Sequence, residues 1–225
     1  MLPSALMRTP TRVGLFDFGQ TTAMFATSRR MAYSTSEMKA GRWPGMLSQS
    51  LIGKTLGVIG TGNIGCQLIA LARSVGMHVI AWTFNPTQQK ADEFGFQYCE
   101  LDELLKKSDV VSVNVKLTDD SREMIGAAQF AMMKPGSIFI NTARAAVVDT
   151  DAMVDSLNSG HLMGAGVDVY DAEPTTGDSP LLQCDQVVLT PHAADQVSEA
   201  IDALNLGAVE NVVNHFAGRP SNNVT

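Results

Sequence analysis

Four polar residues of this chain stand at or just after apolar runs of the kind that form buried strands. Arg144 follows one such run and His192 follows another. Asp168 ends a run between them, and Glu173 comes shortly afterwards. Each has an ordinary interpretation when taken alone, as a solvated cation, a structural histidine, a turn cap or part of a loop. Together, a cation, an imidazole and a carboxylate could hold an anion and transfer a proton.

A glycine-rich stretch, GTGNIG at residues 60–65, has the setting of a dinucleotide site. An apolar run precedes it, and a helical pattern and a second apolar run follow it. In such a unit Gly60 would allow a tight turn, Gly62 would let the backbone approach a pyrophosphate, and Gly65 would let helix and strand pack closely. The helix start offers N–H groups and a positive dipole end to the phosphates. A tight turn with a purely structural role is the alternative.

These two features together indicate one reaction. Ligands of an open parallel sheet lie at the carboxyl ends of its strands, so a dinucleotide on the glycine turn would share that edge with Arg144 and His192. Hydride transfer between an alcohol carbon and a nicotinamide needs a base for the hydroxyl proton, and a cation that holds a carboxylate and polarises the carbonyl oxygen. A carboxylate beside His192 would favour its protonated form.

The order of apolar runs and helical patterns from residue 56 onward predicts the architecture that would position these residues. It favours an α/β fold of the Rossmann type, a doubly wound parallel sheet with helices on both faces. The predicted strands are 56–60, 77–82, 109–115, 137–141, 163–168 and 187–190. The predicted helices are 63–75, 86–94, 101–107, 127–133 and 149–159, and a last helical pattern over 195–217 is expected to close the domain.

Composition excludes several other classes of protein. The 225 residues are 45% hydrophobic and 17% charged, which is typical of a chain that buries a core. The formal net charge of −7, without a basic stripe, argues against a nucleic-acid partner, and no apolar run is long enough to span a membrane. The cysteines, Cys66, Cys99 and Cys184, are scattered and odd in number, which favours a reduced, cytoplasmic setting without a disulfide framework or a metal site.

The N-terminal part of the chain is harder to interpret. A strand is possible over 13–18, and a helical pattern runs from Gln20 to about Lys39. Its methionines at positions 24, 31 and 38 share one seam, so the helix either packs on the core, which we favour, or faces a second subunit. The expected division is an unplaced segment at 1–19, a long helix and linker at 20–50, a dinucleotide-binding domain at 51–217 and a surface tail at 218–225.

Four segments give the chain a resemblance to a known family. They are LIGKTLGVIGTGNIG at 51–65, MKPGSIFINTAR at 133–144, GVDVY at 166–170 followed by Glu173 and Pro174, and LTPH at 189–192. Over roughly residues 20 to 225 the chain resembles the NAD-binding domain of the D-isomer-specific 2-hydroxyacid dehydrogenases. The resemblance implies reversible oxidation of a 2-hydroxy acid to a 2-keto acid, with NAD or NADP as the cofactor.

By this resemblance the site residues take defined roles. Arg144 would bind the substrate carboxylate and ketone oxygen, His192 would be the acid and base, and Glu173 would pair with His192. Asp168 would contact the nicotinamide carboxamide. The other cofactor contacts would come from Gly60, Gly62, Asn63, Ile64, Gly65, Thr83, Leu117, Thr142 and Ala143.

Two positions depart from the family pattern. Ala145 stands where a glycine usually follows the catalytic arginine, which is a small change that should be tolerated. Thr83 stands at the end of the second strand, where an acidic residue would grip the ribose 2′-hydroxyl. Thr83 has no charge to repel a 2′-phosphate, and no Arg nearby would attract one. The sequence leaves NAD versus NADP open, and we expect weak discrimination with a mild lean to NAD because no cation stands nearby.

Family members also carry a separate substrate domain, built mostly from the N-terminal part of their chains. Residues 1–19 are too few for such a domain. We therefore expect either a fragment or shortened product, or a protein that has lost turnover. The alternative function is a dimeric, non-catalytic dinucleotide-binding module that acts as a sensor or partner. The expected partners are a small 2-hydroxy or 2-keto acid and a second copy of the chain, which would associate through the helix at 20–40.

Overall fold

A computed structural model of the protein describes residues 18–194 and 196–219, and it confirms the α/β fold. Its centre is a seven-stranded sheet of order β3-β2-β1-β4-β5-β6-β7, in which every neighbouring pair is parallel. The strands are β1 (Thr55–Ile59), β2 (His78–Trp82), β3 (Gln97–Tyr98), β4 (Val110–Val113), β5 (Ser137–Asn141), β6 (Leu162–Val167) and β7 (Val187–Leu189). The predicted strands are confirmed apart from their end residues, and β3 was not predicted.

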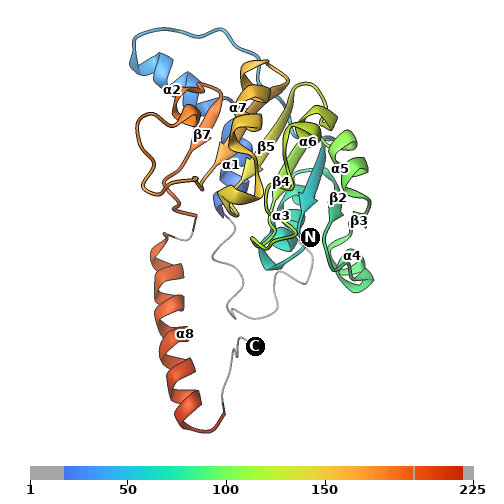
Figure 1. Cartoon of the computed structure of the whole chain (residues 1–225), viewed down its shortest axis with the longest axis vertical. Helices are drawn as coiled ribbons and strands as arrows, with labels where there is room; N and C mark the ends of the chain where they lie inside the picture. The colour runs from blue at the N-terminus through green and yellow to red at the C-terminus, as the bar shows by residue number, and fades with distance from the viewer. Residues whose placement is uncertain (1–17, 195, 220–225) are drawn as a thin grey trace.

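Helices cover both faces of this sheet, as the doubly wound pattern predicts (Figure 1). One face carries α1 (Phe18–Ser28), α3 (Asn63–Ser74) and α4 (Gln88–Phe94). The other carries α5 (Leu101–Lys107), α6 (Ala127–Met132) and α7 (Thr150–Asn158). Two short 3₁₀ helices, η2 (Ala145–Val147) and η3 (Pro180–Gln183), lie in the loops.

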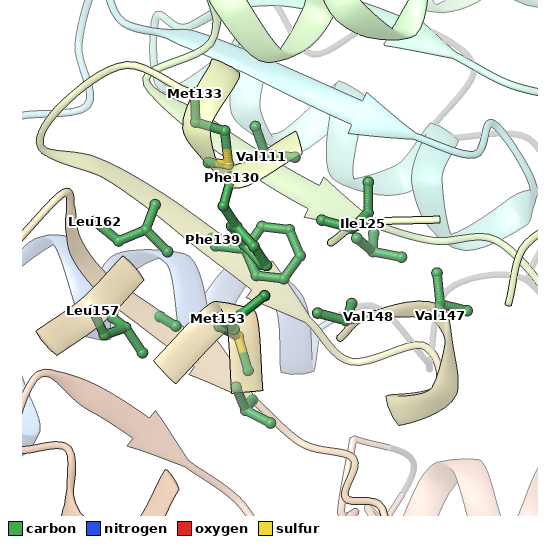
Figure 2. Packing of buried hydrophobic residues seen from close by; sticks show 14 of the residues in the cluster. Val111, Ile125, Phe130, Met133, Phe139, Val147, Val148, Met153, Leu157 and Leu162 are labelled. Atoms are coloured by element: carbon green, nitrogen blue, oxygen red, sulfur yellow. The ribbon is translucent and has the colours of Figure 1, made fainter. Parts of the chain in front are cut away.

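Successive strand residues point into different halves of the core, because side chains alternate across a strand. On β5, Phe139 belongs to the cluster under α5, α6 and α7, whereas Ile138 and Ile140 belong to the cluster under α1, α3 and α4. Figure 2 shows Phe139 packed against Phe130 of α6, and their ring centroids are 5.0 Å apart. The sheet is therefore buried on both sides, which is why its strands read as continuous apolar runs.

The single helix expected over 20–39 is two helices, α1 and α2 (Met31–Lys39). Arg30 separates them with a left-handed backbone (φ 49°), a conformation that a continuous helix does not contain. Met24 is buried, at 1% exposure, but Met31 and Met38 are about half exposed. The core interpretation of the methionine seam therefore holds only for Met24.

Helix α1 lies close against β6, because this strand has glycines where the helix crosses it. A Cβ atom built at Gly166 would be 2.8 Å from Ala23 Cβ, and one built at Gly164 would be 2.9 Å from Thr27 Cγ2. Thr27 Oγ1 also donates a hydrogen bond to the Ala165 carbonyl at 3.3 Å. The helix thereby completes one face of the sheet beside the last strands.

The final helix, α8 (Ser198–Phe216), does not close the domain as expected. Figure 1 shows it extending away from the sheet, and Ala200 is its only buried residue within the described part of the chain. The spacing of its apolar residues predicts an apolar side on this helix. The spacing does not predict that this side packs on the sheet. Its exposed apolar side chains are Ile201, Leu204, Leu206, Val209, Val212, Val213 and Phe216.

Two expectations fall at the ends of the chain. The strand over 13–18 lies outside the described residues, apart from Phe18, which begins α1. The tail at 218–225 is described only as far as Arg219. Within the described residues, no helix is both long and apolar enough to cross a membrane.

Candidate active site

The glycine-rich stretch forms the turn between β1 and α3. Gly60 has φ 102°, and a Cβ there would be 2.7 Å from the Asn114 carbonyl oxygen. A Cβ at Gly65 would be 2.1 Å from the Gly60 carbonyl oxygen, so the fold itself requires both glycines. Gly62 differs, because its φ is −70° and an added Cβ would meet nothing within 4 Å. The open space at Gly62 fits a bound dinucleotide, whose pyrophosphate would need close approach to the backbone.

The start of α3 supplies donors beside this space. Asn63 and Ile64 are its first residues, and both are exposed. The N–H groups of a first helical turn have no partner within the helix, and the aligned peptide dipoles add partial positive charge there. No side chain caps this end, which is therefore suited to a phosphate.

The remaining predicted cofactor contacts follow the carboxyl ends of neighbouring strands. Thr83 follows β2, Leu117 lies in the loop after β4, and Thr142 and Ala143 follow β5. Since all the strands are parallel, these residues share one edge of the sheet with the glycine turn. Leu117 is exposed and the other three are half-buried.

Arg144 lies in a loop shaped by Asn141, a residue to which sequence reasoning gave no role. The Asn141 side chain accepts a hydrogen bond from Ala143 N and donates one to the Arg144 carbonyl, both at 3.0 Å. An asparagine at the end of a strand is a signal for such a side-chain turn. The exposed guanidinium donates from Nη1 to the Ala143 carbonyl at 2.6 Å, and it has further N–H donors for an anion.

His192 and Glu173 meet across two loops. His192 Nδ1 donates to Glu173 Oε2 at 2.7 Å, and the Tyr170 backbone N–H donates to Glu173 Oε1 at 2.9 Å. The hydrogen bond with His192, then that from Tyr170, lowers the pKa of the Glu173 carboxyl, with a smaller contribution from the charge of Arg144. Since Nδ1 carries the proton that Glu173 accepts, Nε2 is the ring nitrogen left for a substrate. Both side chains reach solvent, with 43% and 38% exposed.

Tyr170 is a second residue that the sequence reasoning left without a role. Its hydroxyl donates to the Thr190 carbonyl at 2.7 Å, while its backbone N–H holds Glu173. Burial raises the pKa of the Tyr170 hydroxyl, which therefore remains a donor. The residue ties the loop after β6 to the end of β7, and nothing local in the sequence identifies that partner.

Asp168 is buried at 1% exposure, and both oxygens of its carboxylate accept hydrogen bonds within the protein. Oδ1 accepts from Thr190 Oγ1 at 2.5 Å and from Ala193 N at 2.9 Å, and Oδ2 accepts from Ala194 N at 3.1 Å. These donors flank His192, whose backbone has φ 50°. Asp168 thus fixes the loop that carries His192, and its expected contact with a nicotinamide stays a prediction.

A cation does stand near the cofactor groove, so the expectation that none is nearby was wrong. Lys90, on α4, donates from Nζ to the Thr61 carbonyl at 2.9 Å. Thr61 is the second residue of the glycine turn, and its hydroxyl shares a hydrogen bond with the Tyr98 hydroxyl at 2.9 Å. A lysine on a surface helix usually points to solvent, so the sequence carries no signal that this one turns toward the glycines.

This chain is similar in sequence to proteins of one known family. The sequence profile described as D-isomer specific 2-hydroxyacid dehydrogenase, NAD binding domain, matches residues 21–194. Glyoxylate/hydroxypyruvate reductase B of Cronobacter sakazakii is 39% identical, over 97% of this chain and 70% of its own length. The protein of the same name from Salmonella newport is 37% identical, over 89% of this chain and 64% of its own length.

Solved structures agree with the sequence comparisons. The crystal structure of a glyoxylate reductase from Paecilomyes thermophila is 33% identical with a TM-score of 0.84, covering 92% of this chain and 63% of that chain. The structure of a D-2-hydroxyisocaproate dehydrogenase is 30% identical with a TM-score of 0.87, covering 94% of this chain and 68% of that chain. The chain therefore spans about two thirds of the length of the relatives that it matches.

Proposed function

Since the chain belongs to the D-isomer specific 2-hydroxyacid dehydrogenases and contains their NAD-binding domain, we propose that it supplies the cofactor site and the acid–base residues of a reductase for small 2-keto acids such as glyoxylate and hydroxypyruvate. The family consists of NAD(P)-dependent oxidoreductases. The observation that carries the proposal is the 2.7 Å contact between His192 Nδ1 and Glu173 Oε2, at the same sheet edge as the glycine turn. The relatives do not favour a non-catalytic dinucleotide-binding module.

The residues of the turn fit the cofactor because the space at Gly62 is open and the N–H groups of Asn63 and Ile64 adjoin it. Bound there, NAD(P)H supplies the hydride. Leu117 and the Thr142–Ala143 segment would line the rest of the groove, and Asp168 would adjoin the nicotinamide end.

Each catalytic residue then has one task. The Arg144 guanidinium pairs with the substrate carboxylate and polarises the ketone oxygen, since a planar cation with several N–H donors suits this contact. In the reduction direction His192 donates a proton from Nε2 to that oxygen, and in the oxidation direction it takes the proton back. Glu173 keeps the Nδ1 proton in place and stabilises the imidazolium, because its lowered pKa keeps the carboxylate ionised.

We expect this chain to bind NAD(P)H yet turn over 2-keto acids slowly. Arg144 is exposed and His192 is 43% exposed, so the described residues leave the reacting groups open to water. Much of an enzyme's rate comes from positioning the substrate and excluding water. The measurement combines titration with NADH and NADPH and steady-state cofactor oxidation with glyoxylate or hydroxypyruvate. Failure to bind either cofactor would overturn the proposed function, whereas fast turnover would show that these residues alone complete the cleft.

We also propose that two copies associate through α1, α2 and the segment that follows, in a reduced, cytoplasmic setting. The support for the setting is that the three cysteines are scattered along the sequence and odd in number, a pattern that favours reduced thiols. The support for association is a set of exposed apolar side chains within residues 20–50, since such patches mark contact surfaces. They are Phe25, Met31, Met38, Trp43 and Leu47.

The double substitution Met31→Glu and Met38→Glu is expected to convert a dimer into a monomer, because it places charges on that surface. Sedimentation velocity measures the change. Val209→Glu, on the exposed side of α8, is the matched control and should leave the dimer intact. Dissociation in the α8 variant alone would place the interface on that helix, and a wild-type monomer would rule out the dimer.

A further inference from the structure

We propose that Lys90 selects NADPH over NADH by binding the 2′-phosphate of the adenosine ribose. The inference rests on the proposed function, because it assumes that the glycine turn binds a dinucleotide. It adds a specificity residue on α4 that lies outside the strand–turn–helix motif. It also reverses the lean to NAD that the sequence alone suggests.

The Lys90 ammonium lies against the backbone of the glycine turn. Lys90 Nζ donates to the Thr61 carbonyl at 2.9 Å, so the charge is held at the glycine turn. An ammonium has three N–H donors, and this contact uses one of them. Thr61 is 3% exposed and Lys90 is half-buried, which means that the lysine is packed in place.

The end of β2 lies beside the glycine turn that Lys90 contacts. The Gly60 N–H donates to the Trp82 carbonyl at 2.7 Å, which joins the last residue of β2 to the first glycine of the turn. In this type of fold the adenosine ribose lies at the end of the second strand, where an acidic residue reads its 2′-hydroxyl or a cation accommodates a 2′-phosphate. The residues between β2 and Lys90, TFNPTQQ at 83–89, include no acidic side chain, so this segment offers nothing that repels a phosphate.

Two hydroxyl groups lie close to the carbonyl that Lys90 contacts. The Tyr98 hydroxyl shares a hydrogen bond with Thr61 Oγ1 at 2.9 Å and accepts one from Thr87 N at 3.5 Å. The acidic residues of α4 are Asp92 and Glu93, and Asp92 accepts a hydrogen bond from Gln88 at 2.8 Å. Within the described residues Lys90 forms no ion pair, so its charge is available.

A purely structural role for Lys90 is the competing explanation, in which it only satisfies a buried carbonyl. Cys66 Sγ already donates to the same Thr61 carbonyl, at 3.4 Å, so the carbonyl has a partner without the lysine. The two explanations differ in what they predict for the two cofactors. A structural lysine would support NADH and NADPH binding equally, whereas a phosphate ligand would affect NADPH alone.

The test is calorimetric titration of NADH and NADPH into the wild-type chain and four variants. Wild type should bind NADPH at least about tenfold more tightly, as expected for a charge-assisted hydrogen bond. Lys90→Met keeps the aliphatic stem and should lose that advantage while NADH affinity stays within about twofold. Lys90→Arg should retain the preference, and Thr83→Asp should weaken NADPH binding by charge repulsion. Lys106→Met, on the exposed side of α5, is the matched control and should change neither affinity.

The advantage of NADPH should also shrink as salt is raised, because screening weakens a partly exposed charge contact. A wild-type preference for NADH, or an equal loss of both cofactors in Lys90→Met, would overturn the proposal. If Lys90→Met fails to fold, the affinities of 2′-AMP and 5′-AMP are compared by competition binding to wild type and to Lys90→Arg. Equal affinities for the two nucleotides would overturn the proposal. A wild type that binds neither cofactor would instead remove the proposed function on which this inference rests.

Discussion

Replacement of His192 by alanine is expected to lower kcat for 2-keto acid reduction by about 10²–10⁴-fold, the usual contribution of a general acid. The Nε2 atom is the proton donor in our proposal, and Glu173 holds the ring through Nδ1 at 2.7 Å. Without the ring, water would have to protonate the ketone oxygen. The measurement is single-turnover cofactor oxidation by this chain, with NADPH affinity measured in parallel.

The control for this prediction is His78→Ala. His78 is exposed and begins β2, so it lies at the opposite edge of the sheet from the proposed site. We expect its removal to leave kcat unchanged. Cofactor affinity should stay the same in both variants, since neither histidine is assigned to the dinucleotide. A His192→Ala enzyme with wild-type kcat would contradict the assignment of the proton donor.

Gly62→Val is expected to weaken the binding of both NADH and NADPH by about a hundredfold or more, which corresponds to roughly 2.7 kcal/mol. The physical reason is that the new side chain would occupy the space in which the pyrophosphate approaches the backbone. Folding should be almost unaffected, because a Cβ at Gly62 meets nothing within 4 Å and the backbone has a negative φ of −70°. Calorimetric titration and thermal melting measure the two effects.

Gly45→Val is the matched control, since a Cβ at Gly45 also meets nothing within 4 Å and this glycine lies outside the turn. It should keep both melting temperature and affinity. Gly65→Val should do the reverse of Gly62→Val and destabilise the fold, because its Cβ would lie 2.1 Å from the Gly60 carbonyl oxygen. Unchanged affinity in Gly62→Val would remove the cofactor from the glycine turn.

The sheet was predictable from the sequence because its strands are buried on both faces and read as apolar runs separated by helical patterns. The elements that escaped prediction lack such a local signal. Strand β3, Gln97–Tyr98, has two residues, too few to show a period. Arg30 ends one helix and begins the next without a glycine or proline to mark the break. The apolar spacing of α8 predicts a helix with an apolar side. It does not predict which surface packs against that side, so the position of α8 could not be predicted.

The candidate site shows the same division. Arg144, Glu173 and His192 could be proposed because each lies in a loop at the carboxyl edge of the sheet, and the structure brings Glu173 and His192 into contact. The engagement of Asp168 could not be foreseen, because its partners lie in a loop more than twenty residues further along the chain. Lys90 could not be foreseen either, since its partner on the turn is 29 residues away in sequence. Such meetings depend on tertiary packing.

The contact between α1 and β6 has a consequence for how the chain reaches this structure. Thr27 and Ala165 are joined by a hydrogen bond although 138 residues separate them in sequence. Closing so long a loop costs conformational entropy before the contact returns any stability, and chains rich in such contacts fold slowly. Strands β5 to β7 should therefore acquire slow amide hydrogen exchange later than β1 to β4 during refolding. A rearranged chain in which α1 is moved to stand between α7 and β6 would shorten this loop and should refold faster.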